Sequence, residues 1–159
     1  LEHNYDYIFE MDCDFSHNPD DLVRLYQMAT QGYDVVVGSR YIKGVNVVNW
    51  PMSRLLMSYF ASVYVRFVTR MPVRDATAGF VCYSRKALET LDLDAVKMKG
   101  YGFQIEMKYS AWRLGLKVGE VSIIFTERQE GASKMSGGIF GEAFFGVMKL
   151  PFRRITARK

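Results

Sequence analysis

Apolar and polar residues recur along the chain at two spacings, which predict strands and helices in turn. Residues from Tyr5 to Met11 form an apolar, β-prone run that predicts a first strand, and residues 33–38 predict a second one. Between them apolar side chains recur at helical spacing, and Gly32 ends this predicted helix. A strand, a helix and a strand within about thirty-five residues are typical of a βαβ unit, so we expect a parallel sheet.

The same patterns continue to the end of the chain. Further strands are predicted at residues 80–83 and 117–126, and loops at residues 42–49 and 127–138. Helices are predicted at residues 50–70, from Ser84 onward, at residues 103–114 and at residues 139–150. These elements predict one α/β domain, or part of one, in residues 1–150, followed by a basic tail, residues 151–159, that we expect to be frayed.

The predicted helix at residues 50–70 has almost no polar face. Apolar side chains surround it, and its charged residues are Arg54, Arg66 and Arg70. Such a helix is either buried between a sheet and its neighbours, or it lies at a membrane surface with arginines reaching lipid phosphates. Its longest uncharged apolar-rich run, residues 55–65, is shorter than the ~20 residues that a membrane span requires. We therefore expect no transmembrane helix.

Composition narrows the choice of partners. The 159 residues carry a net charge of +4 with a pI near 9.1, which favours a phosphate, an acidic lipid headgroup or a nucleic acid as partner. Cys13 and Cys82 form no metal-ligand cluster, and free thiols in a reducing compartment are the simplest interpretation, although a bridge stays open. The chain begins almost directly with a strand and without methionine, so we expect it to lack an upstream portion.

Two aspartates follow the first predicted strand. Asp12 and Asp14 are separated by one residue, so their side chains point to the same side where the strand ends. Open α/β sheets bind ligands at the carboxyl ends of their strands. Two carboxylates there suit Mg²⁺ or Mn²⁺, which can hold a substrate diphosphate. A polar junction between strand and turn is the alternative interpretation, which this motif alone does not exclude.

Basic residues extend this candidate site. Arg40 follows the second predicted strand and Arg54 lies 14 residues later, so the two could close on one anion. Arg128 and Lys134 lie in a glycine-containing loop that could fold over a ligand and pair with its phosphate oxygens. Each of these residues, considered alone, could equally be a solvated surface charge.

Two further carboxylates could hydrogen-bond sugar hydroxyls or act as a general base, Asp75 and Glu106. Asp75 could instead be a turn residue that bonds Thr77, and Glu106 a favourable charge near a helix N-terminus. His17 is interpreted as a turn residue near the site and not as a metal ligand. The basic residues are spread and not striped, which argues against a nucleic acid as partner.

Six segments of the chain form a series. They are residues 11–17, 37–41, 49–54, 72–80, 100–107 and 128–135. In this order they resemble the polyprenol-phosphate mannosyltransferases (dolichol-phosphate mannose synthase-like enzymes) of the family-two glycosyltransferases. The Asp-x-Asp pair is generic, but the whole series is specific and spans nearly the whole chain. Cys13 departs from the pattern, because the family usually has a small alanine there.

The resemblance implies a GT-A (Rossmann-like) fold, with a mostly parallel sheet flanked by helices, whose first nucleotide-binding strands are missing from this sequence. It implies transfer of mannose from GDP-mannose to a polyprenyl phosphate, with inversion at the anomeric carbon and with Mg²⁺ or Mn²⁺. Because the acceptor phosphate is already anionic, placing it in line and neutralising charge could suffice without a strong general base.

The resemblance also implies roles for individual residues. By analogy, Asp12 and Asp14 hold the metal and the donor diphosphate. Arg128 and Lys134 clamp the donor phosphates. The residues expected to bind the acceptor are Ser39, Arg40, Arg54, Asp75 and Gln104, and those expected to act in catalysis are Asp14, Arg40, Arg54 and Glu106.

We therefore expect a peripheral enzyme at the cytoplasmic face of a membrane, with this chain alone inactive. An enzyme that transfers glucose or N-acetylglucosamine from a UDP-sugar to the same kind of lipid is an alternative. A non-catalytic module that binds lipid phosphates or membranes is an alternative of another class.

Overall fold

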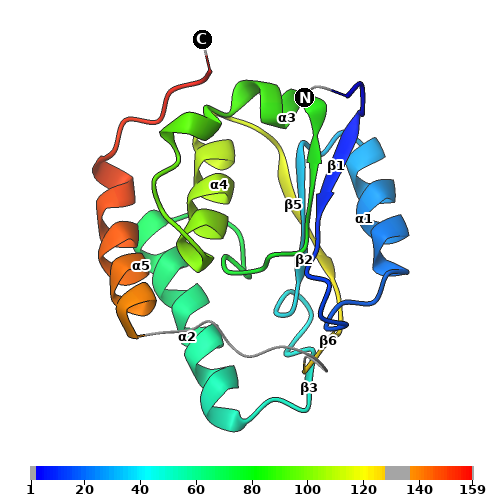
Figure 1. The fold of residues 1–159 in the computed structure, drawn as a ribbon, viewed down its shortest axis with the longest axis vertical. Helices are drawn as coiled ribbons and strands as arrows, with labels where there is room; N and C mark the ends of the chain where they lie inside the picture. The colour runs from blue at the N-terminus through cyan, green and yellow to red at the C-terminus, as the bar shows by residue number, and fades with distance from the viewer. Residues whose placement is uncertain (1–2, 128–136, 159) are drawn as a thin grey trace.

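The computed structural model describes residues 3–127 and 137–158, except for the side chains of residues 137–140. Its main sheet contains β1 (Tyr7–Glu10), β2 (Val35–Ser39), β4 (Val81–Ser84) and β5 (Val118–Ser122), in the order β1-β4-β2-β5. Helices cover both faces of this sheet (Figure 1). The predicted α/β architecture is therefore confirmed.

Strand β4 runs against the other strands of the sheet. It pairs antiparallel with β1 and with β2, whereas β2 and β5 pair in parallel. The strands β1, β2 and β5 therefore point the same way, as expected for a mostly parallel sheet. The first two strands are parallel to each other, as the βαβ pattern predicts, but they do not pair directly, because β4 lies between them. Periodicity identifies a strand, but packing between distant segments decides its neighbours.

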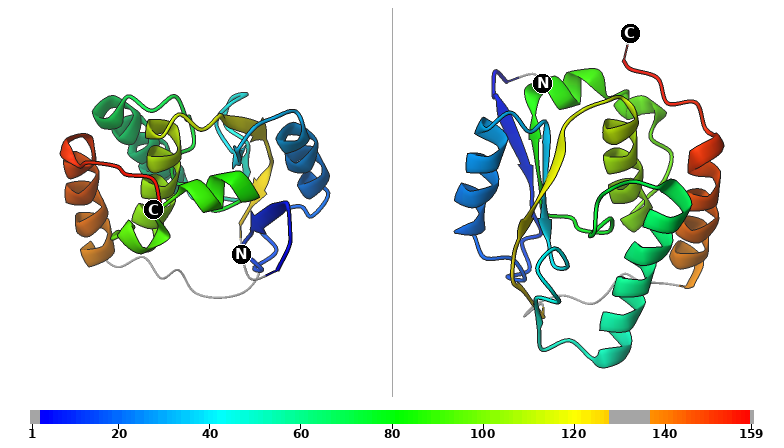
Figure 2. Two further views of the ribbon diagram at one scale, coloured as in Figure 1. Left: turned by 90° about the horizontal axis from the view of Figure 1, so that it is seen from above. Right: turned by 180° about the vertical axis from the view of Figure 1, so that it is seen from behind.

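One helix covers one face of the sheet, and three cover the other among the described residues. On the first face, α1 (Asp21–Thr30) packs against Val36, Phe80 and Ile123 through Leu25 and Ala29. Figure 2 shows the opposite layer from two further directions. It consists of α2 (Met52–Thr69), α4 (Tyr101–Arg113) and α5 (Gly137–Lys149), and it encloses the larger part of the core.

Short elements complete the chain. A second, parallel pair of strands, β3 (Val47–Val48) and β6 (Phe125–Thr126), lies next to the start of α2 (Figure 1). The strand predicted at residues 117–126 is thus divided, because its first part pairs with β2 and its second part with β3. The remaining helical elements are α3 (Arg85–Thr90), η1 (Leu93–Ala95) and η2 (Leu150–Phe152).

Few residues of helix α2 are buried. Of its residues only Ser62, Val65 and Thr69 are buried. The side chains of Phe60 and Phe67 are 60% and 84% exposed. The structure therefore excludes the interpretation of this helix as a buried core helix. Within the described ranges, no helix combines the length and the hydropathy that crossing a bilayer requires.

The basic tail packs back on the domain, so the expectation of a frayed tail is wrong for the described residues. Ala157 forms a β-bridge with Leu91, and the Arg158 amide donates to the Thr90 carbonyl at 2.9 Å. Arg153 donates hydrogen bonds to the Glu106 carboxylate and to the Ala95 carbonyl. These contacts give the tail buried partners that its basic composition alone does not reveal.

Candidate active site

A cavity of about 380 Å³ opens at the carboxyl ends of β1 and β2 and continues between α2 and α5. The residues that follow the strands give it a polar wall, which includes Asp12, Asp14 and Arg40. The helices give it an apolar wall. That wall is formed by Met57, Phe60, Ala61, Tyr64, Ile105, Phe144 and Val147. The cavity can therefore accept a ligand with a charged and an apolar part.

The acidic pair lies where the sequence predicts it, beyond the end of β1. Asp12 and Asp14 both line the cavity. The Oδ1 atom of Asp14 accepts hydrogen bonds from the amide and the hydroxyl of Ser16, at 3.1 and 2.5 Å. Phe15 between them has a φ of 60°, a conformation that bulky residues rarely adopt and that turns the chain back on Asp14. Backbone strain of this kind often accompanies functional sites.

A divalent cation fits the acidic pair on chemical grounds. The Asp12 side chain is 66% exposed, so its carboxylate is open to a ligand. In the described part of the chain, no three side chains of His, Cys, Asp or Glu come close enough to form a complete metal site. Mg²⁺ needs no such cage, because it commonly binds one or two carboxylates and completes its shell with water and substrate phosphates.

His17 lies beside the acidic pair and is almost fully buried. Its ring packs between Phe80 and Phe125, with centroids 4.9 and 5.0 Å away. Its Nε2 atom lies 3.9 Å from Asp12 Oδ2, and neither ring nitrogen has a hydrogen-bond partner within the described structure. Burial lowers the pKa of His17, although Asp12 and Asp14 oppose this effect. The imidazole is therefore neutral near pH 7.

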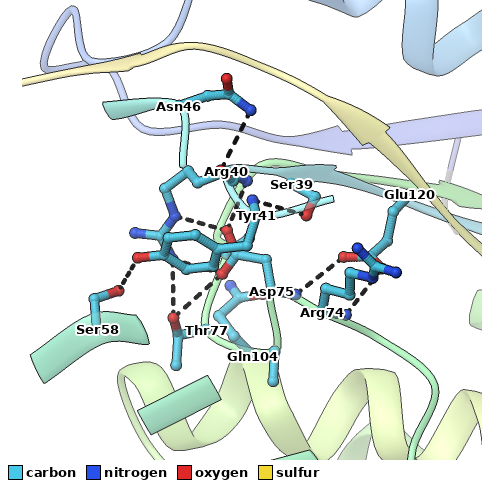
Figure 3. Close-up of polar contacts among 12 residues, drawn as sticks. Ser39, Arg40, Tyr41, Asn46, Ser58, Arg74, Asp75, Thr77, Gln104 and Glu120 are labelled. Atoms are coloured by element: carbon cyan, nitrogen blue, oxygen red, sulfur yellow. Dashed lines mark hydrogen bonds and ion pairs between the residues drawn. The ribbon is translucent and has the colours of Figure 1, made fainter. Parts of the chain in front are cut away.

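Arg40 is held by a buried carboxylate (Figure 3). Its Nε and Nη2 atoms donate to the two Asp75 oxygens at 2.7 and 2.6 Å, and its backbone amide donates to Asp75 Oδ2 at 2.9 Å. Nη2 also donates to Thr77 Oγ1 at 2.9 Å. Burial alone would lower the pKa of Arg40, but the charge of Asp75 and its hydrogen bonds outweigh burial and raise it. Arg40 is therefore a fixed, permanent positive charge.

An aromatic wall supports both predicted arginines. The Arg54 guanidinium lies 4.2 Å from the centre of the Trp50 ring, and Arg40 lies 5.4 Å from the same ring. Arg54 Nη1 donates to both oxygens of Glu127, at 2.5 and 2.6 Å. Both arginines line the cavity, as the sequence predicts. Arg40 and Arg54 are 14 residues apart in the sequence, and both lie near the ring of Trp50, which lies between them in the chain.

Three residues predicted for acceptor binding do not line the cavity. Asp75 is fully buried. Its carboxylate accepts hydrogen bonds from the guanidinium and the amide of Arg40 and from the Thr77 hydroxyl, so it positions Arg40 and has no room for a ligand. Ser39 is also fully buried, and its hydroxyl accepts from the Tyr41 amide. Gln104 is buried and donates to Glu10. The structure thus places Ser39, Asp75 and Gln104 behind the cavity wall and not in it.

The structure also places Glu106 away from the cavity. Its carboxylate is buried and accepts hydrogen bonds from the amides of Lys97 and Met98, at 3.0 and 2.8 Å, and from Arg153. These partners belong to the segment just before α4 and to the tail. Glu106 does not line the cavity, and its contacts tie the tail to the domain, so nothing in this geometry supports the catalytic role that the resemblance implies. Arg128 and Lys134 lie outside the described residues.

Sequence reasoning missed several residues that shape the site. Lys108 is fully buried in α4 and donates to backbone carbonyls of the segment that carries Asp75 and Thr77. Glu120 accepts hydrogen bonds from the amides of Arg74 and Asp75, at 2.8 and 3.0 Å. The sequence offers no signal for Lys108, because its burial, shared by all residues from Gln104 to Ala111 of α4, follows from the packing of the helix.

The comparisons with known proteins agree with this architecture. Residues 2–92 match the family model described as Glycosyl transferase family 2. The chain is 46% identical over 149 residues to the undecaprenyl-phosphate mannosyltransferase of Micrococcus luteus, covering 94% of this chain and 61% of the relative. It is 45% identical over 153 residues to the polyprenol monophosphomannose synthase of Mycolicibacterium smegmatis, covering 96% of this chain and 58% of the relative.

This chain thus spans about 60% of the length of these two curated relatives. The resemblance that the sequence motifs indicate is confirmed by the family match, which covers more than half of the chain. The sheet with helices on both faces agrees with the fold expected for that family. The chain belongs to glycosyltransferase family 2.

Proposed function

We propose that the protein transfers mannose from GDP-mannose to a polyprenyl phosphate, with inversion at the anomeric carbon and with Mg²⁺ or Mn²⁺. One observation carries this proposal: a single cavity joins an acidic pair and two arginines to an apolar groove between α2 and α5. A polyprenyl phosphate has the same two parts, a phosphate and a long hydrocarbon chain. The names of the two relatives refer to undecaprenyl phosphate and to polyprenol monophosphomannose, which are lipids of this kind.

The phosphate of the acceptor fits the Arg40 end of the cavity. Asp75 fixes the Arg40 guanidinium through two parallel hydrogen bonds, so little further ordering is needed when an anion binds. Arg54 stacks on Trp50 and forms an ion pair with the partly buried Glu127. A phosphate is already charged at neutral pH, so these residues need to orient it but not to deprotonate it.

The donor diphosphate fits the Asp12 and Asp14 end. Two carboxylates would repel a diphosphate, and a bound divalent cation supplies the charge that joins them and stabilises the leaving group. Asp14 is oriented by Ser16, and Asp12 is open to the cavity. Arg128 and Lys134 are proposed as further partners of the donor phosphates on the grounds of the sequence motif alone.

We propose further that the exposed faces of α2 and α5 lie on a membrane, at its cytoplasmic side. The two helices lie side by side (Figures 1 and 2), and Tyr64 joins them by stacking on Phe144 and donating to its carbonyl. Their large apolar side chains are exposed, among them Phe60, Phe67 and Phe145. Clusters of exposed apolar side chains are typical of interaction surfaces.

Two arguments favour a lipid surface for this patch. The apolar half of the cavity opens between the same helices, so a lipid-borne acceptor could enter without crossing water. Basic residues also gather at the carboxyl ends of the two helices, which lie at the same end of the molecule (Figure 1). These are Arg66, Arg70 and Lys149, all exposed and able to reach anionic headgroups.

The proposal is tested by assaying the full-length protein that carries this chain. Radiolabelled GDP-mannose, UDP-glucose or UDP-N-acetylglucosamine is supplied with polyprenyl phosphate and Mg²⁺ or Mn²⁺, and label is counted in the organic phase. We expect label from GDP-mannose only, and its loss in Asp14→Ala. Asp94→Ala, on η1 and away from the cavity, serves as the control and should retain activity. Transfer from a UDP-sugar would show that the donor is that sugar nucleotide and not GDP-mannose. No transfer from any donor would refute the proposal.

A further inference from the structure

Lys108 is a fully buried lysine that the proposed reaction does not use directly. Its side chain extends from α4 toward the segment of residues 75–79, which connects α2 to β4. The ammonium nitrogen donates to the carbonyls of Ala76 and Ala78, at 3.2 and 2.6 Å. It also donates to the carbonyl of Gln104 at 3.1 Å and to its side-chain oxygen at 3.4 Å. Lys108 therefore ties this segment to a rigid helix.

The segment of residues 75–79 holds the Arg40 guanidinium, which is the fixed positive charge of the cavity. Asp75 and Thr77 accept hydrogen bonds from the Arg40 guanidinium, and Asp75 also accepts from the Arg40 amide. Ala78 and Gly79 line the cavity themselves. Inside the segment, the Ala78 amide reaches the Asp75 carbonyl only at 3.4 Å. The segment thus depends on outside contacts, and in the described structure Lys108 donates two of them.

Lys108 is also connected to the acidic side of the site. Gln104, one turn before Lys108 on α4, donates to the carboxylate of Glu10 at the end of β1. Glu10 lies two residues before Asp12 in the sequence. A buried polar network therefore runs from β1 through Gln104 and Lys108 to the segment that holds Arg40. Fully satisfied networks of this kind rigidify the groups that they connect.

We propose that Lys108 is a positioning residue, which holds residues 75–79 against α4 so that Asp75 keeps the Arg40 guanidinium in place for the acceptor phosphate. The part of this inference that concerns the acceptor rests on the proposed function. The part that concerns Asp75 and Arg40 does not, because hydrogen bonds within this chain define it.

The first test measures hydrogen exchange in the full-length protein. We call the contact between Asp75 and Arg40 the clamp. Exchange of the Arg40 amide reports on it directly, since this amide donates to Asp75 Oδ2 at 2.9 Å. In Lys108→Met we expect exchange at Arg40 and at residues 76–79 to become roughly tenfold faster or more, because losing a buried hydrogen bond weakens local structure by that order. Lys99→Met, at an exposed lysine just before α4, is the matched control and should exchange like the wild type.

The second test measures steady-state transfer kinetics of the same variants. We expect the KM for polyprenyl phosphate to rise about tenfold in Lys108→Met, with the KM for the donor and kcat little changed. A general loss of structure would change all three parameters together. Lys108→Gln, which retains an amide donor, should restore part of the acceptor affinity.

The outcomes separate the two claims. Unchanged protection of the Arg40 amide in a folded Lys108→Met protein would refute the positioning role, whatever the protein's activity. Faster exchange with an unchanged acceptor KM would refute the part of the proposal that concerns the acceptor phosphate. If wild-type protein transfers no sugar, the proposed function fails, and the exchange data still decide whether Lys108 holds the clamp. Should Lys108→Met not fold, the same measurements on Lys108→Gln decide.

Discussion

Arg40 and Arg54 line one cavity but are held in different ways. Arg40 and Asp75 form a pair whose side chains are 8% and 0% exposed, with two parallel hydrogen bonds. Arg54 and Glu127 form a pair whose side chains are 26% and 29% exposed. Solvent screens the second pair, whereas removal of one partner of the first leaves a buried charge without compensation. The two pairs therefore differ in their effect on stability.

Asp75→Asn tests this difference. The substitution keeps the size of the side chain but removes the charge that compensates Arg40, so we expect it to lower the free energy of unfolding by about 3–5 kcal/mol. Glu127→Gln is the matched control at the other arginine, where we expect a change of about 0–1 kcal/mol. Urea unfolding of the full-length protein measures both. Equal losses in the two variants would contradict the contrast between the pairs.

Lys108 makes stability depend on pH. Burial lowers the pKa of Lys108 to about 7, although Asp75, Glu10 and Glu120 raise it in part and Arg40 lowers it further. An unfolded lysine keeps its ordinary value near 10.4. Between these values the unfolded chain binds more protons than the folded one, so this residue makes stability rise with pH above 7.

The corresponding measurement compares the free energy of unfolding at pH 7.0 and pH 8.5 in the wild type and in Lys108→Met. The increase with pH should be larger in the wild type, because the variant lacks the titrating amine. The contributions of all other titrating groups to the pH dependence are the same in both proteins and cancel in this comparison. The control Lys99→Met should show the pH dependence of the wild type. An identical pH dependence in wild type and Lys108→Met would contradict a lowered pKa.

At this scale the sequence predicts positions better than contacts. The cavity does contain Asp12, Asp14, Arg40 and Arg54, because strand ends and short motifs place them. The buried partners of these residues could not be predicted in the same way. A buried lysine in a helix has the same letter as an exposed one, and only the three-dimensional packing distinguishes them. For the same reason Glu106 was assigned to catalysis although it binds Arg153.

Helix α2 carries the main ambiguity at the scale of elements. Its sequence fits both a core helix and a surface helix, because it is apolar on nearly every side. The structure resolves this by burying only Ser62, Val65 and Thr69 against the rest of the domain. Its exposed apolar side chains, among them Phe60 and Phe67, form with those of α5 the patch that we propose to lie on a membrane. Secondary structure was thus predictable for this helix, but its environment was not.

Phe67→Asp tests the proposed membrane contact. Phe67 is 84% exposed near the carboxyl end of α2, so a charge there should leave folding intact but weaken binding to vesicles of mixed neutral and anionic phospholipid about tenfold. Val23→Asp places the same charge at an exposed apolar residue of α1, on the other face of the sheet, and should bind like the wild type. Cosedimentation measures both. Equal binding of Phe67→Asp and the wild type would contradict this orientation.

The whole molecule combines two kinds of surface in one cavity. The carboxyl ends of the strands supply charged side chains, as they do in open α/β folds, and α2 and α5 supply an apolar groove. Strand order was the part of the fold that the sequence left open: β4 enters the sheet between β1 and β2 through contacts between residues far apart in the chain. The cavity depends on this order, because Ala78 and Gly79 reach its wall just before β4.

The central claim is that this cavity binds the acceptor with its phosphate at the arginines and its chain between α2 and α5. The most direct measurement photo-crosslinks the full-length protein to a polyprenyl phosphate that carries a diazirine in its first isoprene units, followed by peptide mass spectrometry. We predict crosslinks within residues 57–65 and 143–147 that excess unlabelled polyprenyl phosphate abolishes. Competed crosslinks confined to other segments, such as α1, would contradict the account.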